Sequence, residues 1–192
     1  HQFNAESGSV LAVPNTHGEI DLVLVGISAA ANPLWALAGL PARLPRGDYK
    51  IVSHWSDANE QLALMGFGLA CYRFDRYKSQ RQSQARLLVK DEWADELEVL
   101  LEASYLARDI ANTPANDMGP QELSSLAQSL AEAHGGTFHE VMGLELEEKF
   151  PAIHTVGQAS SRDPRLITLK WGREDAPSLA LVGKGVVFDS GG

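Results

Sequence analysis

The stretch from Leu179 to Gly192 constrains the fold most, because it joins apolar runs to charged residues and glycines. Residues 179–182 are apolar and lead into Gly-Lys-Gly, and a second apolar run ends at Asp189, which precedes Ser190 and two glycines. This pattern predicts a buried strand that ends in a tight turn with close backbone approach. Such a strand delivers Lys184 and Asp189 to one region of the fold.

Lys184 and Asp189 are an odd number of residues apart, so an unbroken strand would place them on opposite faces. A bulge at Gly185, or the turn after Ser190, would bring both to one site. Charged groups beside Val186 and its apolar neighbours are costly unless they are paired or bind a cation. Two interpretations stay open from the residues alone. In the first, Asp189 and the neutral amine of a desolvated lysine bind a divalent cation. In the second, the two side chains form a partly buried ion pair.

Two other motifs fit this stretch less well. A Walker loop needs a glycine five positions before Gly183 and Ser or Thr after the lysine, but Ser178 and Gly185 stand there. The run Phe-Asp-Ser-Gly at 188–191 resembles the aspartic-protease signature, in which two carboxylates share a proton. That hypothesis requires folded sequence after the motif, where this chain has one residue, so we keep it only as a distant alternative.

Three segments resemble the leucyl aminopeptidase family of two-metal peptidases. Residues 182–192, Val-Gly-Lys-Gly-Val-Val-Phe-Asp-Ser-Gly-Gly, resemble its catalytic signature almost residue for residue. Residues 72–78 resemble the Tyr-x-Phe-Asp-x-Tyr segment near the end of its N-terminal domain, and residues 106–120 resemble the start of its catalytic domain. An alternative for the third segment is a joint between two helices, which Arg108 and Asp109 hold without doing chemistry.

The resemblance implies a metalloaminopeptidase that releases N-terminal, leucine-like residues from peptides. Two divalent cations, zinc or manganese with magnesium also compatible, would activate a water that attacks the N-terminal peptide bond. Lys184 would bind one metal and Asp189 would contact both, whereas no catalytic residue is expected within this chain. The family's remaining ligands and its catalytic arginine lie in an Asn-Thr-Asp-Ala-Glu-Gly-Arg segment, which this sequence lacks. The 192-residue chain alone is therefore expected to be inactive.

The same resemblance implies an α/β fold with two parts. Residues 1–85 would form a macro-domain-like N-terminal α/β domain, and residues 86–192 a linker helix and the first part of an α/β catalytic domain. Family members of this kind form homohexamers, so a homohexamer acting on peptides is expected. The alternative is a regulatory or assembly module whose α/β domain works without peptidase activity.

The hydrophobic pattern predicts the individual elements. Residues 20–27 are nearly all aliphatic, which favours a strand that is covered on both faces inside a sheet. The most regular helical pattern covers residues 91–111, and Pro114 ends it. An α/β sheet with active groups at strand ends fits this order of elements. Helices are expected over 59–72, 91–111, 120–134 and 144–150, strands over 9–13, 20–27, 49–53, 137–141 and 165–171, and an aliphatic turn over 151–157.

The charge balance argues against a general affinity for nucleic acid. The chain has a formal net charge of -9 and a pI near 5.1, whereas binding to a phosphate backbone requires a basic footprint. One local exception is a basic segment near residue 80. We expect it to be a solvated linker surface, with a subunit or nucleic-acid contact as the alternative. Its basic residues are Arg73, Arg76, Lys78, Arg81 and Arg86.

Cys71 is the single cysteine, so an internal disulfide is impossible and a reducing cytoplasmic setting fits best. We interpret Cys71 as a small buried residue. The sequence has no apolar run of membrane-span length and no signal peptide, which favours a cytoplasmic protein without a membrane partner. The histidines fall in no ligand spacing such as His-Glu-x-x-His.

Overall fold

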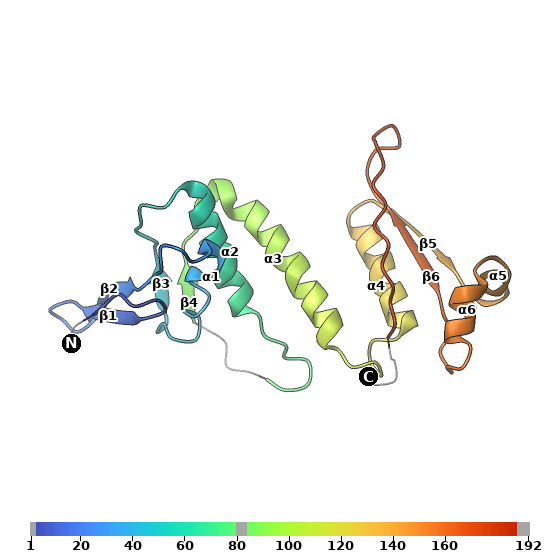
Figure 1. The fold of residues 1–192 in the computed structure, drawn as a ribbon, viewed down its shortest axis with the longest axis horizontal. Coiled ribbons are helices and arrows are strands. Elements are labelled where there is room, and N and C mark those ends of the chain that lie inside the picture. Colours follow the sequence, from blue (N-terminus) through green and yellow to red (C-terminus); the bar gives the residue numbers. More distant parts are fainter. Residues whose placement is uncertain (1–2, 80–83, 188–192) are drawn as a thin grey trace. The chain divides into compact units, whose positions relative to one another are not determined.

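The computed structural model describes residues 3–79 and 84–187. Its internal contacts divide the chain into two compact units, His1–Asp109 and Ile110–Gly192, called here the N-terminal unit and the C-terminal unit (Figure 1). Helices and small sheets alternate along the chain, which confirms the predicted α/β class. Each unit is described by itself.

The N-terminal unit begins with a β-hairpin of β1 (Val10–Pro14) and β2 (Ile20–Val25). Its turn is closed by the Asn15 side chain, which accepts hydrogen bonds from the backbone of His17 (2.8 Å) and Glu19 (3.0 Å). The prediction that β2 is covered on both faces is wrong, because Ile20 and Leu22 are 40% and 47% exposed. The first half of β2 is exposed and therefore lacks the second layer that a strand buried on both faces needs.

Two helices and a parallel strand pair form the core of this unit. Helix α1 is capped by Asn32, whose side chain accepts from Leu34 N (3.0 Å), and Pro33 lies in its first turn. α1 crosses α2 closely at Gly66, where an added Cβ would lie 1.6 Å from Leu34 O. The buried core residues are Leu37, Leu40, Ala63, Phe67 and Ala85. The elements are α1 (Pro33–Ala36), β3 (Gly47–Tyr49), α2 (Asp57–Cys71) and β4 (Ala85–Leu87).

β3 is shorter than the strand that the sequence predicted, and it pairs with β4. Gly47 pairs with Ala85 and Tyr49 with Leu87 in parallel register. The expected strand over 49–53 is therefore wrong beyond Tyr49, because β3 begins and ends earlier.

The helix α3 (Asp91–Asn112) confirms the helix predicted over 91–111, and their ends differ by one residue. Asp91 and Glu92 lie in its first turn, where negative charge favours the positive end of the helix dipole. Trp93 and Leu97 are buried with Leu64 of α2 in a second small core. α3 is thereby attached to α2 by apolar contacts at its start.

The C-terminal unit contains a two-stranded antiparallel sheet with helices beside it (Figure 1). Helix α4 begins with a capping contact, in which Gly119 N donates to the Glu122 carboxylate at 2.8 Å. The strands pair in the register Thr137 to Lys170 and Val141 to Leu166. The turn expected over 151–157 is wrong, since these residues form a helix that opens with Pro151. The elements are α4 (Pro120–Ala133), β5 (Thr137–Val141), α5 (Gly143–Lys149), α6 (Pro151–Gly157) and β6 (Leu166–Lys170).

Candidate functional site

The segment that carries Lys184 is extended and exposed. Leu179, Leu181 and Val182 are 85%, 89% and 97% exposed, and residues 179–187 form no strand. The prediction of a buried strand is therefore wrong over these described residues. Among the described residues this segment pairs with no strand, and its exposure means that no second layer covers it.

Lys184 is exposed, and Asp189 lies outside the described residues. The predicted meeting of these two side chains stays a prediction. Within residues 3–79 and 84–187, no three His, Cys, Asp or Glu side chains gather as a metal would require. The described residues do not form a dication site around Lys184 by themselves. Over the same ranges, no helix has the length and apolarity that crossing a membrane demands.

The family-like segments at 72–78 and 106–120 meet in the N-terminal unit, through two residues that are 37 positions apart. The buried Tyr72 hydroxyl donates to Asp109 Oδ1 at 2.7 Å. The Arg108 guanidinium lies 3.9 Å from the centre of the Tyr72 ring and donates to Leu69 O at 2.7 Å. Arg108 and Asp109 therefore have the packing role that we predicted. The helix against which they hold α3 is α2.

Tyr105 reinforces this joint from the same side of α3. Its hydroxyl donates to Gly68 O at 2.5 Å, and its ring lies 5.3 Å from that of Tyr72. Burial raises the pKa of Tyr105, so the phenol stays a donor at neutral pH. Gly68 leaves the space that Leu101 fills, because an added Cβ would lie 2.6 Å from that side chain. The motif residues thus join two helices.

Cys71 is half-buried at the end of α2, and burial raises the pKa of its thiol. This agrees with the interpretation of Cys71 as a packing residue, since a raised pKa keeps it a neutral thiol. The nearby Arg73 donates to Ala70 O (3.0 Å) in the last turn of α2 and to the carbonyl of its C-cap residue Tyr72 (2.6 Å). Part of the basic segment is therefore used to end α2.

A polar cluster in the C-terminal unit was missed from the sequence. Arg165 pairs with Glu140 at 2.6 Å, and their side chains are only 10% and 20% exposed. Ser124 of α4 also donates to Glu140, and Gln121 accepts from Arg165. Burial alone would raise the pKa of Glu140, but these two donors and the charge of Arg165 hold it below its ordinary value. The cluster connects α4, β5 and the start of β6.

Arg162 holds the loop before α4. Its guanidinium donates to Ala115 O at 2.6 Å and Asn116 O at 2.7 Å. This loop is part of the family-like segment at 106–120, so a side chain more than forty residues away holds the backbone conformation of that segment. The available sequence signal was weak, because a lone arginine in a polar loop has no characteristic spacing.

The comparisons with known proteins define the class first. The family model described as M17 aminopeptidase, N-terminal domain, matches residues 1–90, and that of the cytosol aminopeptidase family, catalytic domain, matches residues 105–192. The two matches follow each other in the order that the sequence resemblance implied. The chain therefore belongs to the M17 cytosol aminopeptidase family, as the three segments predicted.

Individual relatives agree. The chain is 32% identical over 212 residues to a probable cytosol aminopeptidase of Rhodococcus jostii, covering 98% of this chain and 42% of the relative. It is 31% identical over 206 residues to one of Aeropyrum pernix, covering 97% and 40%. The chain thus spans about two fifths of the length of these relatives.

Solved structures show the same fold. The crystal structure of the cytosol aminopeptidase from Coxiella burnetii matches with a TM-score of 0.88 and 34% identity, over 91% of this chain and 38% of the other. The bottromycin maturation enzyme BotP, solved in complex with Mn, matches with a TM-score of 0.75 and 24% identity, over 90% and 41%. At that identity the second match concerns the fold alone.

Proposed function

We propose that this chain is the N-terminal part of a metal-dependent aminopeptidase that releases leucine-like residues from the N-termini of peptides. The observation that carries the proposal is the ordered pair of family matches, of which the second includes residues 182–192 with their Gly-Lys-Gly and Phe-Asp-Ser-Gly-Gly groups. Both relatives named above are described as probable cytosol aminopeptidases, which supports the same activity for a protein of their length.

Lys184 and Asp189 are the proposed metal ligands in this chain. A neutral amine and a carboxylate suit zinc or manganese, and the amine becomes neutral only where it is desolvated. The exposed position of Lys184 supplies no such desolvation. We therefore propose that the segment 179–187 becomes a covered strand in a protein of its relatives' length.

When bound, two divalent cations supply an activated water and polarise the carbonyl of the N-terminal peptide bond. The contribution of this chain is to hold the cations through the Lys184 amine and the Asp189 carboxylate. Two donors leave most positions of two metals without a protein ligand. For this reason we propose that the 192-residue chain alone is inactive.

Assembly, location and domain limits are part of the same proposal. We propose a homohexamer in the cytoplasm, by analogy with the family. We also propose a functional boundary near residue 85, between a macro-domain-like domain and the start of the catalytic domain. The family models leave residues 91–104 unassigned, and the contact division lies at Asp109, both inside α3.

The test begins with the intact mass of the natural polypeptide that carries this sequence. Its hydrolysis of leucine p-nitroanilide is then measured after chelation and after addition of manganese or zinc. A mass above 20.8 kDa with metal-dependent hydrolysis supports the proposal. A mass of 20.8 kDa without hydrolysis would instead favour the regulatory or assembly module.

Two substitutions at Lys184 separate a metal ligand from an ion pair. Lys184→Ala removes both functions, whereas Lys184→Arg keeps a cation that never becomes a neutral donor. A metal ligand predicts loss of hydrolysis in both variants. Full hydrolysis by Lys184→Arg would instead show the ion pair with Asp189. Lys170→Ala, at an exposed lysine of β6, is the control and is expected to keep its activity.

A further inference from the structure

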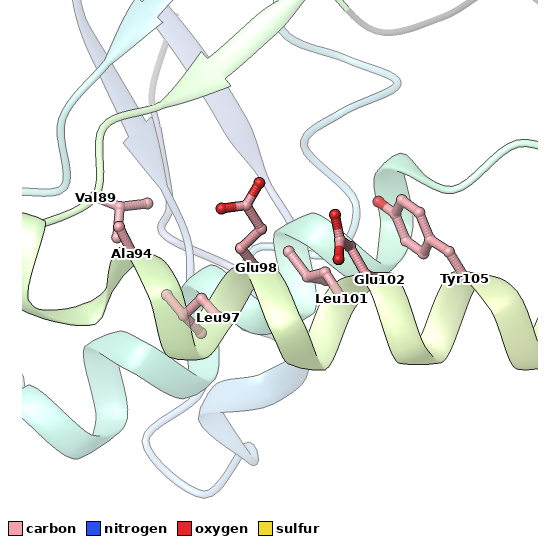
Figure 2. Close-up of a pocket in the computed structure, with 7 residues that line it drawn as sticks. All are labelled: Val89, Ala94, Leu97, Glu98, Leu101, Glu102 and Tyr105. Carbon is pink, nitrogen blue, oxygen red and sulfur yellow. The ribbon is translucent and has the colours of Figure 1, made fainter. Parts of the chain in front are cut away.

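An apolar groove runs along one face of α3 in the N-terminal unit. It has a volume of about 290 Å³. Its lining residues on α3 recur at intervals of three and four, which places them on one helix face. We call it the α3 groove and define it by Val89, Leu97, Leu101 and Tyr105, with Glu98 and Glu102 at its side (Figure 2).

The α3 groove combines an apolar floor with two carboxylates. In Figure 2 the Leu101 side chain lies between those of Glu98 and Glu102 along the helix, and Leu97 lies just before Glu98. Both glutamates are exposed and lie four residues apart on the same face. An occupant of matching chemistry therefore has an apolar or aromatic group with positive charge beside it.

The same unit contains a segment of that chemistry, Arg76-Tyr77-Lys78. Tyr77 is 54% exposed, and both basic neighbours are exposed. The Arg76 guanidinium lies 5.8 Å from the centre of the Tyr77 ring, so the cation and the ring are close together. Residues 76–78 form a bend, and their side chains are not held on alternate sides as in a strand.

We propose that Tyr77 of one copy of this chain occupies the α3 groove of a second copy, with Arg76 and Lys78 beside Glu98 and Glu102. Tyrosine and arginine are the residues that most often anchor protein interfaces. Contact between two α3 grooves is disfavoured, because it would bring glutamates of like charge together. The inference rests on the proposed self-association and adds to it the two surfaces that meet.

The two surfaces differ, so the contact is heterologous. Each copy offers one groove and one Arg-Tyr-Lys segment. Repeated contacts of this kind form a closed ring when the rotation that relates neighbouring copies leads back to the first copy. Within one described chain, the Tyr77 ring lies 5.8 Å from that of Phe74 rather than among the groove residues. A contact within one chain is a separate outcome, which the test below distinguishes.

The test is a charge exchange, measured by sedimentation velocity on the 192-residue chain. Arg76→Glu with Lys78→Glu, and separately Glu98→Lys with Glu102→Lys, are each expected to raise the dissociation constant about tenfold or more. An equimolar mixture of the two double variants is expected to associate again. The control is Glu92→Lys with Glu96→Lys, an exposed acidic pair of α3 with the same spacing outside the groove.

The aromatic anchor is tested separately. Tyr77→Ala is expected to weaken association about tenfold or more, and Tyr77→Phe to preserve it, because the ring fills the groove. Circular dichroism checks that every variant is folded.

Several outcomes would overturn the inference. Equal association by all variants would reject the groove contact and leave self-association intact. A mixture that does not re-associate, with each double variant weakened, would mean that the contact does not join two copies. A wild-type chain that stays monomeric would reject this contact, and the homohexamer proposed for a protein of its relatives' length would then have to use other surfaces. Hydrolysis of leucine p-nitroanilide by the longer protein is measured independently, so the peptidase proposal stands or fails by itself.

Discussion

Gly66→Ala is predicted to destabilise the N-terminal unit, because α1 and α2 touch at this residue. The new Cβ would lie 1.6 Å from the oxygen and 2.7 Å from the carbonyl carbon of Leu34. Real Cβ contacts stay at or above 3.0 Å, so the two helices must separate by about 1.4 Å. Both obstructing atoms belong to the backbone, and no rotation of a side chain relieves the contact.

The magnitude follows from two opposing effects. Overpacking a core costs about 3 kcal/mol at the upper end of its usual range, which suits a clash with backbone. Alanine favours a helix interior over glycine by about 1 kcal/mol. The net expectation is a loss of about 2 kcal/mol in the free energy of unfolding, equivalent to about 10 °C in Tm for a unit of this size.

Urea unfolding followed by tryptophan fluorescence measures this change, since Trp35, Trp55 and Trp93 all lie in the N-terminal unit. The control is Gly39→Ala, whose added Cβ meets no atom within 4 Å. It is expected to alter stability by about 0.5 kcal/mol or less. A Gly66→Ala midpoint equal to that of wild type would refute the close crossing of α1 and α2.

Three further changes test the joints in the two units. Tyr72→Phe removes the hydrogen bond to Asp109 and is expected to cost about 2 kcal/mol in urea unfolding, the scale for a bond to a charged group. Arg162→Ala is expected to speed amide hydrogen exchange at 115–119, because the loop loses two backbone contacts; unchanged exchange would contradict this. The pKa of Glu140 is lowered on folding, so its stabilisation is present above about pH 4.5 and is lost as pH falls through the lower folded value. Glu140→Gln should therefore flatten the acid limb of stability against pH in thermal melts.

Helices were the most predictable part of the fold. The helix α3 was placed within one residue because its apolar positions recur at helical spacing and Pro114 stops it. Both signals are local, so they depend on no distant contact. The packing role of Arg108 and Asp109 was also expected, but the partner Tyr72 was not. Nothing in local spacing indicates a hydrogen bond across 37 residues.

Strands were less predictable, because their environment depends on neighbours elsewhere in the chain. The aliphatic run at 20–27 has the composition of a doubly covered strand, yet β2 belongs to a two-stranded hairpin and is half exposed. The buried pair of Arg165 and Glu140 was missed for a related reason. A single charge within a strand pattern is typical of a solvent-facing position, and only the packing of α4 against the strands covers it.

The segment around Lys184 has a clear local sequence signal, but its environment depends on contacts from elsewhere. Its apolar composition indicates burial, whereas Leu181 and Val182 are among the most exposed apolar residues described. A strand is stabilised by pairing on its edges and by cover on its faces, and the described residues 179–187 have neither. The chain spans about two fifths of its relatives. The apolar composition of residues 179–187 is compatible with their exposure if the contacts that would cover them come from sequence that those relatives possess. The joint of Tyr72 and Asp109 is complete within this chain, but a metal site at Lys184 would need such additional contacts.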